Sequence, residues 1–268
     1  MPIDIRLHGK DGPEVVLLHG GPGAPGSVWS LAEALADEFR VLEPLQRRCG
    51  DVPLTVRQHV EDLAEVAPPS APIVGWSWGA MLALSYAAAF PERVTGLVLV
   101  GCGTYDVESR DLLEERKRER LGEAEVSEAQ EIRRRLEEAG TAEEQDRLFG
   151  RLGELATQAQ AHDPVEVEED EHPFDRRGHE ETWADVLYLQ ETGREPLAFS
   201  AIGVPVLMLH GEDDPHPGTH IHSVLQTFVP HVELELLDRC GHEPWKERHA
   251  RKRFLRLLRK RLHRLAEA

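Results

Sequence analysis

Short apolar runs alternate along the chain with segments whose apolar residues recur three and four positions apart. The runs are typical of buried β-strands, and the three-and-four spacing is typical of helices. The pattern predicts seven strands, at Ile3–Leu7, Val15–Leu18, Arg40–Glu43, Pro72–Gly75, Gly96–Val100, Val204–Leu209 and Val232–Leu236. It predicts helices between and after them, at Val28–Glu38, Val56–Val66, Trp78–Phe90, Thr219–Phe228 and about Glu247–Leu265. This alternation predicts an α/β fold with a mainly parallel, doubly wound sheet.

The alternation stops between about residues 105 and 196. This stretch is rich in Glu and Arg, and it has helical spacing at Leu112–Leu121, Val126–Ala139, Ala142–Leu155 and Glu180–Gln190. The helical segments are separated by Gly122, Gly140, Pro164, Pro173 and Gly178, and an acidic run at Val165–Glu171 is expected to be an exposed loop. We therefore expect a core domain of residues 1–104 and 197–268 and an inserted α-helical cap, or lid, of residues 105–196. Insertions after strand ends lie where α/β sheets bind ligands, so the cap should border the functional site.

Composition narrows the class of protein. A chain of 268 residues can bury a large core, and its formal net charge of −18 argues against a nucleic-acid partner. No apolar run approaches the roughly 18 residues of a membrane span, so no stable membrane insertion is expected. Three cysteines without a CxxC pair, and a start without an apolar signal segment, predict a cytoplasmic location. The sequence indicates no particular oligomeric state.

The last predicted helix is basic and amphipathic. Phe254, Leu258, Leu262 and Leu265 share one of its faces, and basic residues occupy the other. Such a helix could contact a membrane or a partner protein, but a terminal helix packed on the sheet has the same pattern. We expect the packed arrangement.

The strongest chemical motif is the run Gly75-Trp76-Ser77-Trp78-Gly79. It follows a predicted strand and precedes a predicted helix, the context in which a GxSxG turn lifts a serine Oγ off the backbone. Glycines are expected at both ends because the turn approaches neighbouring backbone. We expect Ser77 to be a nucleophile; the alternative is a tight turn with a purely structural role.

A glycine-rich loop, His19-Gly20-Gly21-Pro22-Gly23, follows the second predicted strand. Glycines let backbone N–H groups approach a bound oxyanion, so this loop beside the serine turn would complete an oxyanion hole. We assign the two donors to the N–H groups of Gly21 and Trp78.

A serine nucleophile needs a base, and the base needs an acid that orients it. An acidic stretch that ends at Asp214 follows the sixth predicted strand, and His242 lies in the loop after the seventh. The chain order of serine, acid and histidine predicts Asp214 as the acid and His242 as the base. Asp213 competes with Asp214, and Asp106 is a more remote candidate.

No metal or other cofactor is expected. His216, His220 and His222 lie within seven residues of one another. Pro217 and Gly218 disfavour a continuous helix through the first two, so we expect these histidines on the surface and not at a metal.

These motifs together resemble the α/β-hydrolases of the proline iminopeptidase-like group. HGGPG at 19–23, QRRCG at 46–50 in place of that group's QRGCG, and Gly75–Gly79 in place of GGSWG occur in the same order and spacing. The resemblance covers roughly residues 13–105 and 200–255. It implies an α/β-hydrolase fold, a catalytic triad and an oxyanion hole, made by Ser77, Asp214 and His242 and by Gly21 and Trp78.

The sequence also departs from that group. Leu45 stands where the peptidases have an aspartate, and Arg48 and Trp76 stand where they have glycines. The cap glutamates that hold the substrate's free amine in true iminopeptidases have no residue-by-residue match. The resemblance therefore implies a hydrolase through its catalytic core alone.

One helical face of the cap is a candidate substrate-binding surface. Trp183 and Leu187 share this face, and Glu180 lies one turn earlier. The face could line the pocket, with Glu180, Glu181 or Glu191 binding a substrate ammonium group. It could also pack on the core domain and leave the glutamates in solvent, and we favour this second arrangement.

The sequence therefore predicts a serine hydrolase that cleaves a small carboxylic ester or amide through an acyl-enzyme intermediate. Its partner would be a small-molecule ester, an amide or a short peptide. An aminopeptidase of the proline iminopeptidase type is the alternative, and we favour an ester because no site for a substrate amine is evident. A non-catalytic binding protein on a hydrolase fold is disfavoured because no triad residue is missing.

Overall fold

A seven-stranded sheet organises the molecule, which the computed structural model describes over residues 2–170 and 172–267. The strand order is β1-β3-β2-β4-β5-β6-β7, and β1 runs antiparallel to β3 while the other neighbours pair in parallel. The strands are β1 (Ile5–His8), β2 (Glu14–Leu18), β3 (Arg40–Pro44), β4 (Ala71–Trp76), β5 (Val94–Val100), β6 (Val206–Gly211) and β7 (Val232–Leu237). The seven predicted strands and the mainly parallel sheet are confirmed.

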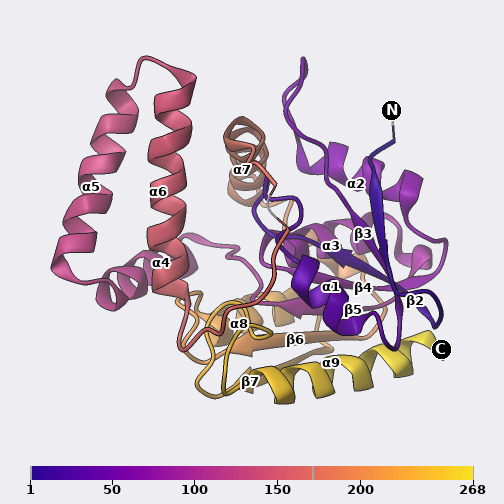
Figure 1. Cartoon of the computed structure of the whole chain (residues 1–268). Coiled ribbons are helices and arrows are strands. Elements are labelled where there is room, and N and C mark those ends of the chain that lie inside the picture. Colours follow the sequence, from indigo (N-terminus) through magenta and orange to yellow (C-terminus); the bar gives the residue numbers. More distant parts are fainter. Residues whose placement is uncertain (1, 171, 268) are drawn as a thin grey trace.

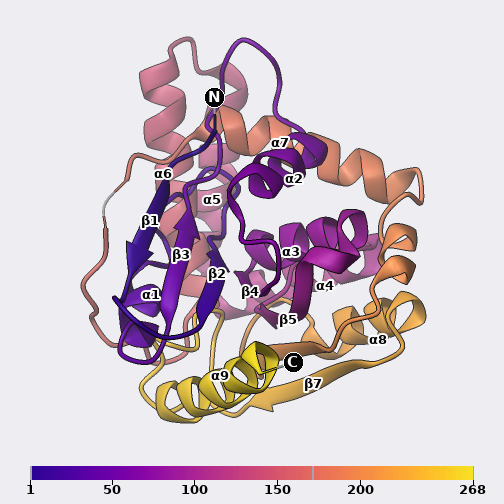
Figure 2. The same ribbon diagram turned by 90° about the vertical axis from the view of Figure 1, so that its right-hand side faces the viewer.

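Helices cover both faces of this sheet (Figures 1 and 2). One face carries α2 (Val56–Val66), α3 (Trp78–Ala89) and α8 (Gly218–Phe228), and the other carries α1 (Trp29–Leu35) and α9 (Arg251–Ala266). Alternate side chains of a strand point to opposite faces, so β2 contributes residues to two separate apolar layers. Val16 and Leu18 pack with α2 and α3, and Val15 and Leu17 pack with α1 and α9. Burial on both faces explains why the central strands are continuous apolar runs.

The C-terminal helix packs against the sheet as expected. Phe254, Leu258, Leu262 and Leu265 of α9 are at most 3% exposed and belong to the apolar layer that includes β4 and β5. The basic face of α9 points outward, where Arg261 and Arg253 pair with glutamates of β7. The prediction that this helix docks on the core is confirmed.

Four helices lie between β5 and β6: α4 (Val107–Arg120), α5 (Glu123–Glu138), α6 (Ala142–Gln160) and α7 (Arg176–Glu191). Figure 1 shows α5 and α6 as a hairpin that stands away from the sheet, with α4 at its base and α7 closer to α2. The hairpin has a small apolar core of its own, made by Ala129, Ile132, Leu148 and Leu155. No helix in the described part of the chain is long and apolar enough to cross a membrane.

Side-chain contacts move three helix boundaries from their predicted positions, through caps in α4 and α7 and through Glu247 before α9. Helix α4 begins five residues early because the Asp106 carboxylate accepts from Ser109 N, and the Ser109 hydroxyl accepts from Asp106 N. Helix α7 includes Gly178, a predicted break, because Asp175 caps the helix there; a Cβ on Gly178 would lie 2.4 Å from an Asp175 oxygen. Helix α9 begins later than expected because Glu247 binds backbone N–H groups of other segments.

Short 3-10 turns complete the fold at η1 (Pro91–Arg93) and η2 (Leu197–Ala201). Residues 165–170 of the acidic run lie outside helices and strands and are half-buried to exposed, in agreement with the expected loop. Residue Glu171 of that run lies outside the described residues.

Candidate active site

Ser77 occupies a sharp turn between β4 and α3. Its φ is +55°, a backbone conformation that a residue with a side chain rarely adopts. The turn is crowded: a Cβ on Gly75 would lie 2.2 Å from Gly79 O, and one on Gly79 would lie 2.3 Å from Leu18 O. Glycine is therefore required at both positions, and the strand, turn and helix predicted for the motif are present.

Asp214 and His242 meet at the carboxyl ends of the neighbouring strands β6 and β7. His242 Nδ1 lies 2.6 Å from Asp214 Oδ2, and both residues are 2% exposed. Burial alone would raise the pKa of Asp214, but the adjacent histidines hold this pKa well below its ordinary value. Asp214 is thus a carboxylate that can fix the His242 ring with Nε2 directed away from it.

The backbone after β5 leaves no room for a side chain beside this pair. Gly101 has a φ of +52°, and a Cβ at this position would lie 2.9 Å from His242 Nδ1. A larger residue here would displace the imidazole from Asp214.

The two competing carboxylates point elsewhere. Asp213, with 36% of its side chain exposed, pairs with His162 Nδ1 at 3.0 Å. Asp106 caps α4 and pairs with His220 Nε2 at 3.0 Å. Neither contacts His242 among the described interactions, so Asp214 is the carboxylate that the fold places against His242.

His216 is part of this site, and the prediction that it lies on the surface is wrong. Its Nδ1 lies 2.8 Å from Asp214 Oδ1, and its ring stacks on that of His242 with centroids 4.4 Å apart. Burial lowers the pKa of His216 to about 4, so the ring is neutral near pH 7. The turn folds inward because Gly218 leaves room for the His210 ring, 2.4 Å from where a Cβ would stand.

The three clustered histidines therefore do not share a metal site. His220 pairs with Asp106, and His222 Nε2 lies 3.0 Å from Val232 O. Asp214, His216 and His242 do have ligand atoms within 4.8 Å of one another. Since Nδ1 of both rings contacts the Asp214 carboxylate, this arrangement is a hydrogen-bonded network centred on one acid.

The glycine-rich loop is joined to the serine turn through Gln46. His19 Nε2 accepts from Gln46 N at 3.2 Å, and the Gln46 side chain donates back to His19 O. The same amide accepts from Trp78 Nε1 at 2.7 Å. Trp78 N–H is the first of α3 and has no acceptor within the helix, and Gly21 lines the same cavities as Ser77. The network thus fixes both segments that carry the assigned oxyanion donors.

Trp76, a departure from the peptidase motif, fills the space between that loop and the histidine loop. Its indole Nε1 donates to His242 O at 3.0 Å, and its ring lies 5.4 Å from the His242 ring. A Cβ on Gly20 would lie 2.7 Å from the Trp76 ring. The tryptophan therefore fits because Gly20 has no side chain, and it supports the backbone of His242.

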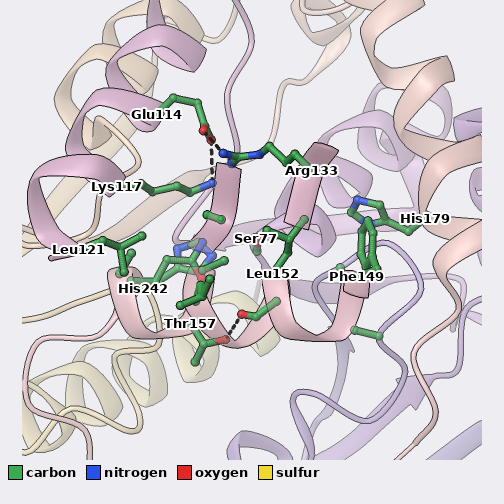
Figure 3. A pocket seen from close by; sticks show the side chains of 18 of the residues that line it. Ser77, Glu114, Lys117, Leu121, Arg133, Phe149, Leu152, Thr157, His179 and His242 are labelled. Atoms are coloured by element: carbon green, nitrogen blue, oxygen red, sulfur yellow. Dashed lines mark hydrogen bonds and ion pairs between the residues drawn. The ribbon is translucent and has the colours of Figure 1, made fainter. Parts of the chain in front are cut away.

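Two neighbouring cavities open at Ser77. The larger has a volume of about 700 Å³ and extends toward α5 and α6. Ser77, His242 and His179 line it (Figure 3), as do Gly21 and Trp183. The smaller, of about 360 Å³, extends toward α4 and is also lined by Ser77 and Trp78. Ser77, His242, Gly21 and Trp78 therefore border two cavities that share Ser77 and Gly21 in their linings, and four of the lining helices are α4–α7.

Of the candidate cap residues, only Trp183 lines the cavities. Glu180 pairs with Arg176 and has 52% of its side chain exposed, and Leu187 does not line either cavity. Glu181 accepts from Leu54 N, and Glu191 is exposed. Glu180 and Glu191 lie in solvent, as the favoured arrangement has them, whereas Glu181 is bound to the backbone of Leu54 and Trp183 lines the cavity.

His179 of α7 is a lining residue that the sequence did not indicate. Its Nδ1 lies 3.0 Å from Pro22 O in the glycine-rich loop, and its ring stacks on Trp183. Asp175 N donates to Gly23 O, so α7 is joined to the loop at two points. Burial lowers the pKa of His179, so the ring is neutral near pH 7. A lone histidine beside a glycine in an acidic segment carries no motif that could have identified it.

Residues 15–256 match a family model described as "Alpha/beta hydrolase family". The chain belongs to this family. The resemblance seen in the sequence and the expected fold class are both confirmed, and the turn, acid and histidine described above lie where the fold brings strand ends together.

Curated relatives of this alpha/beta hydrolase have two kinds of name. A pimeloyl-[acyl-carrier protein] methyl ester esterase from Methylococcus capsulatus is 42% identical over 109 residues, 39% of this chain and 42% of that protein. A proline iminopeptidase from Neisseria gonorrhoeae is 37% identical over 102 residues, 34% of this chain and 33% of that protein. These matches span less than half of either relative. A second pimeloyl-[acyl-carrier protein] methyl ester esterase, from Nitrosomonas europaea, is 26% identical over 253 residues, 91% of this chain and 93% of that protein.

Solved structures of similar shape include enzymes of both kinds. A thermophilic esterase from Thermogutta terrifontis superposes with a TM-score of 0.60 at 20% identity, covering 98% of this chain and 94% of that one. A proline iminopeptidase from Mycobacterium smegmatis gives 0.61 at 18% identity, with 98% and 94% coverage. At these identities the likeness establishes the fold.

Glu247 is a further residue of this hydrolase that the sequence did not single out. It is 1% exposed, and its two oxygens accept from Gly241 N, His162 N and Asp163 N at 2.8–3.0 Å. His242 N also donates to Gln160 O at 2.9 Å. The loop that carries His242 is therefore bound to the end of α6 by a buried carboxylate and by its own backbone. The only sequence signal is an acidic residue five positions after the histidine.

Proposed function

We propose that this alpha/beta hydrolase is a serine hydrolase that cleaves a small carboxylic ester through an acyl-enzyme intermediate. One observation carries the proposal: Ser77, held at a sharp turn, lines the same cavity as His242, whose other ring nitrogen is hydrogen-bonded to Asp214. This observation supports the roles of Ser77 as nucleophile, His242 as base and Asp214 as the acid that orients the base.

In the first half of the reaction, Ser77 Oγ attacks the ester carbonyl carbon while His242 Nε2 takes the hydroxyl proton. The carbonyl oxygen becomes an oxyanion that accepts from the N–H groups of Gly21 and Trp78. Collapse of this intermediate breaks the bond to the alcohol oxygen, which receives the proton from His242. The alcohol leaves, and the acyl group stays on Ser77.

In the second half, water takes the place of the alcohol. His242 removes a proton from the water as it attacks the acyl carbon, and the proton then returns to Ser77 Oγ when the carboxylic acid is released. Asp214 stays ionised throughout and stabilises the imidazolium that forms twice. The cycle consumes one water and leaves the protein unchanged, so these residues suffice without a cofactor.

An ester is favoured over a peptide because the expected amine-binding glutamates point away from the cavity. Glu180 and Glu181 are engaged by arginines of their own helix, and Glu191 is exposed. A proline iminopeptidase-type activity is the second candidate, and one observation favours it: Glu114 of α4 lines both cavities beside Ser77. A carboxylate there could bind a substrate ammonium group if its present cation partners were displaced.

We also propose that residues 105–196 act as a cap on a core domain of residues 1–104 and 197–268. Two observations support this division. Helices α4–α7 interrupt the sheet between β5 and β6, and residues of all four line the cavity at Ser77. Such a cap would exclude water and shape the space for the substrate.

The test is a fluorophosphonate probe, followed by a panel of 4-nitrophenyl acyl esters and aminoacyl 4-nitroanilides. We expect covalent labelling of the wild type and of Ser70→Ala, a matched control on an exposed serine before β4, and none of Ser77→Ala. Turnover of esters and not of anilides supports the esterase. Preference for anilides with a free amine supports the aminopeptidase, and absence of labelling supports a binding protein.

A further inference from the structure

A cluster of charged side chains lines the larger cavity and lies above Ser77 in the view of Figure 3. Lys117 and Arg133 flank Glu114: Lys117 Nζ lies 3.1 Å from one Glu114 oxygen, and Arg133 lies 3.5 Å from the other. Arg118 also lines this cavity. Lys117 and Arg133 thus share one carboxylate, and Arg118 donates its Nε–H to the backbone oxygen of Glu114. Positive charge is therefore in excess among these four side chains.

This excess is unusual for the molecule, whose formal net charge is −18. An anionic ligand is repelled by most of such a surface, so a cavity wall of opposite sign selects where an anion can bind. Lys117 and Glu114 line both cavities at Ser77, so the cations are near the reacting centre. The charge of Lys117 also contributes, after burial, to the lowered pKa of His216, which indicates that its field reaches the histidine pair.

Lys117 and Arg133 have N–H donors that Glu114 does not use. An ammonium group has three N–H donors and a guanidinium has five, whereas Glu114 takes one contact from each partner. Side-chain exposure is 22% for Lys117 and 57% for Arg133, so both remain accessible from the cavity. A second carboxylate could therefore join the cluster without breaking the existing pairs.

Apolar side chains cover much of the remaining wall. They come from α4, α5 and α6 and comprise Leu121, Val126, Phe149, Leu152 and Leu155. An aliphatic chain could pack against them, and a charged end could reach the cations.

We propose that the cavity selects esters whose acyl chain is aliphatic and ends in a carboxylate, with Lys117 and Arg133 as the residues that bind this anionic end. The inference rests on the proposed esterase function and specifies its substrate class as monoesters of aliphatic dicarboxylic acids. In this role Glu114 opposes substrate binding, because its charge partly neutralises the two cations.

The test compares two esters that differ only at the end of the acyl chain: 4-nitrophenyl hexanoate, which is neutral, and the mono-4-nitrophenyl ester of adipic acid, which is anionic. At low ionic strength we expect wild-type kcat/KM to be about tenfold or more higher for the anionic ester, the effect of one hydrogen bond to a charged group. The preference should shrink as salt is added, because screening weakens exposed charge pairs.

Variants of the two partners in one ion pair should act in opposite directions. Lys117→Met should remove the preference for the anionic ester, and Glu114→Gln should increase it. Arg151→Met is the matched control. Arg151 lies on the same α5–α6 hairpin as Arg133, but it pairs with Glu128 and Glu154 away from the cavity at Ser77. Its loss should leave the preference unchanged. Equal kcat/KM for the two esters in the wild type overturns the proposal. Loss of the preference in both Lys117→Met and Glu114→Gln also overturns the proposal, because removing either partner of a purely structural ion pair would have the same effect.

Failure of the proposed esterase function gives a different result, in which neither ester is hydrolysed and the fluorophosphonate does not label Ser77. Calorimetric titration of Ser77→Ala with adipate then examines the anion site by itself. Binding that is weakened about tenfold by an added Lys117→Met supports the site, and heat that is unchanged by Lys117→Met contradicts it. The proposal is also overturned if the wild type prefers an anilide with a free amine and Glu114→Gln abolishes this preference, because Glu114 would then bind a substrate cation.

Discussion

The rings of His216 and His242 stack face to face, 4.4 Å between centroids, and contact opposite oxygens of one carboxylate. That carboxylate, Asp214, also accepts from His216 N at 2.9 Å. Its two oxygens are therefore held on both sides, and rotation about the side-chain bond would break contacts with two rings. The orientation of His242, the proposed base, thus depends on His216, which does not line the larger cavity.

Asp214→Asn should reduce kcat by several decades while Asp213→Asn has little effect. The amide of Asn cannot stabilise an imidazolium and favours the wrong ring tautomer, which costs about 10⁴ in comparable triads. Asp213 is its matched control, since it pairs with His162 and is 36% exposed. Steady-state kinetics on a 4-nitrophenyl ester measures both variants. The reverse ranking would move the acid to Asp213.

Ser77→Ala should abolish hydrolysis and leave the thermal midpoint within a few degrees of the wild type. Loss of the nucleophile removes turnover by several decades, whereas the small side chain at this turn contributes little packing. Turnover above about a tenth of the wild type would contradict the assignment.

Ser77→Gly should unfold at a higher temperature than Ser77→Ala. The turn holds residue 77 at a φ of +55°, and this conformation costs a residue with a Cβ of the order of 1–3 kcal/mol. The greater freedom of Gly in the unfolded chain lowers the free energy of unfolding by about 1 kcal/mol, which is the smaller effect. Scanning calorimetry on both inactive variants compares their midpoints. Equal midpoints would show that the turn is not strained.

Stability should fall as the pH is lowered from about 6.5 toward 4. Burial lowers the pKa values of His19, His59 and His216 to about 4, so these rings stay neutral in the folded protein while the unfolded chain takes up protons below pH 6.5. Each ring then removes about 1.4 kcal/mol from the free energy of unfolding per pH unit, and the full stability is present above pH 6.5. Glu195, whose pKa burial raises to about 7, and His8, whose pKa is raised by its hydrogen bond to Glu43, act in the opposite direction, but they are two groups against three.

Urea denaturation at pH 7 and pH 5 measures this slope. His59→Gln provides a control, because its amide can still contact Thr182 but cannot take up a proton. Proton uptake on unfolding at pH 5 should decrease by about one in this variant. A slope that does not change would mean that His59 is protonated in the folded protein.

Glu247→Gln should lower kcat by about tenfold to a hundredfold with little change in KM, because it loosens the loop that carries His242 without touching the substrate cavity. Glu243→Gln is the control on the same loop, since this carboxylate pairs with Lys246 and does not contact the backbone that Glu247 holds. Kinetics should be measured well below the unfolding midpoint of both variants. Equal effects of the two changes on kcat would argue against a positioning role for Glu247.

The sheet and the core of the site could be predicted from the sequence because both depend on local signals. Apolar runs mark strands that are buried on both faces, and the GxSxG turn, the HGGPG loop and the two residues that follow β6 and β7 occupy fixed places at strand ends. Crowding at Gly75 and Gly79 explains why the turn motif has so little freedom.

The side of the site formed by α4–α7 could not be predicted in the same way. Helix α4 is polar nearly all around, so its periodicity does not show that Glu114 and Lys117 face the cavity. The roles of His179 and Glu247 depend on contacts with segments far away in the sequence, which no local pattern encodes. Glu180 and Leu187 share a helical face with Trp183, but the packing of α7 on the core places only Trp183 at the cavity.

The proposed cap could be exchanged for that of another hydrolase in order to change substrate specificity. The hydrogen bond from His242 N to Gln160 O limits where the two chains of such a chimera can be joined. A donor cap that ended before residue 160 would remove an acceptor from the histidine's own backbone, and Glu247 would lose its contacts with residues 162 and 163. Residues 160–163 and 241–248 therefore form one module in spite of their separation in the chain. A chimera that keeps them together should preserve turnover while it exchanges specificity, and evolution of a new pocket in this lineage faces the same requirement.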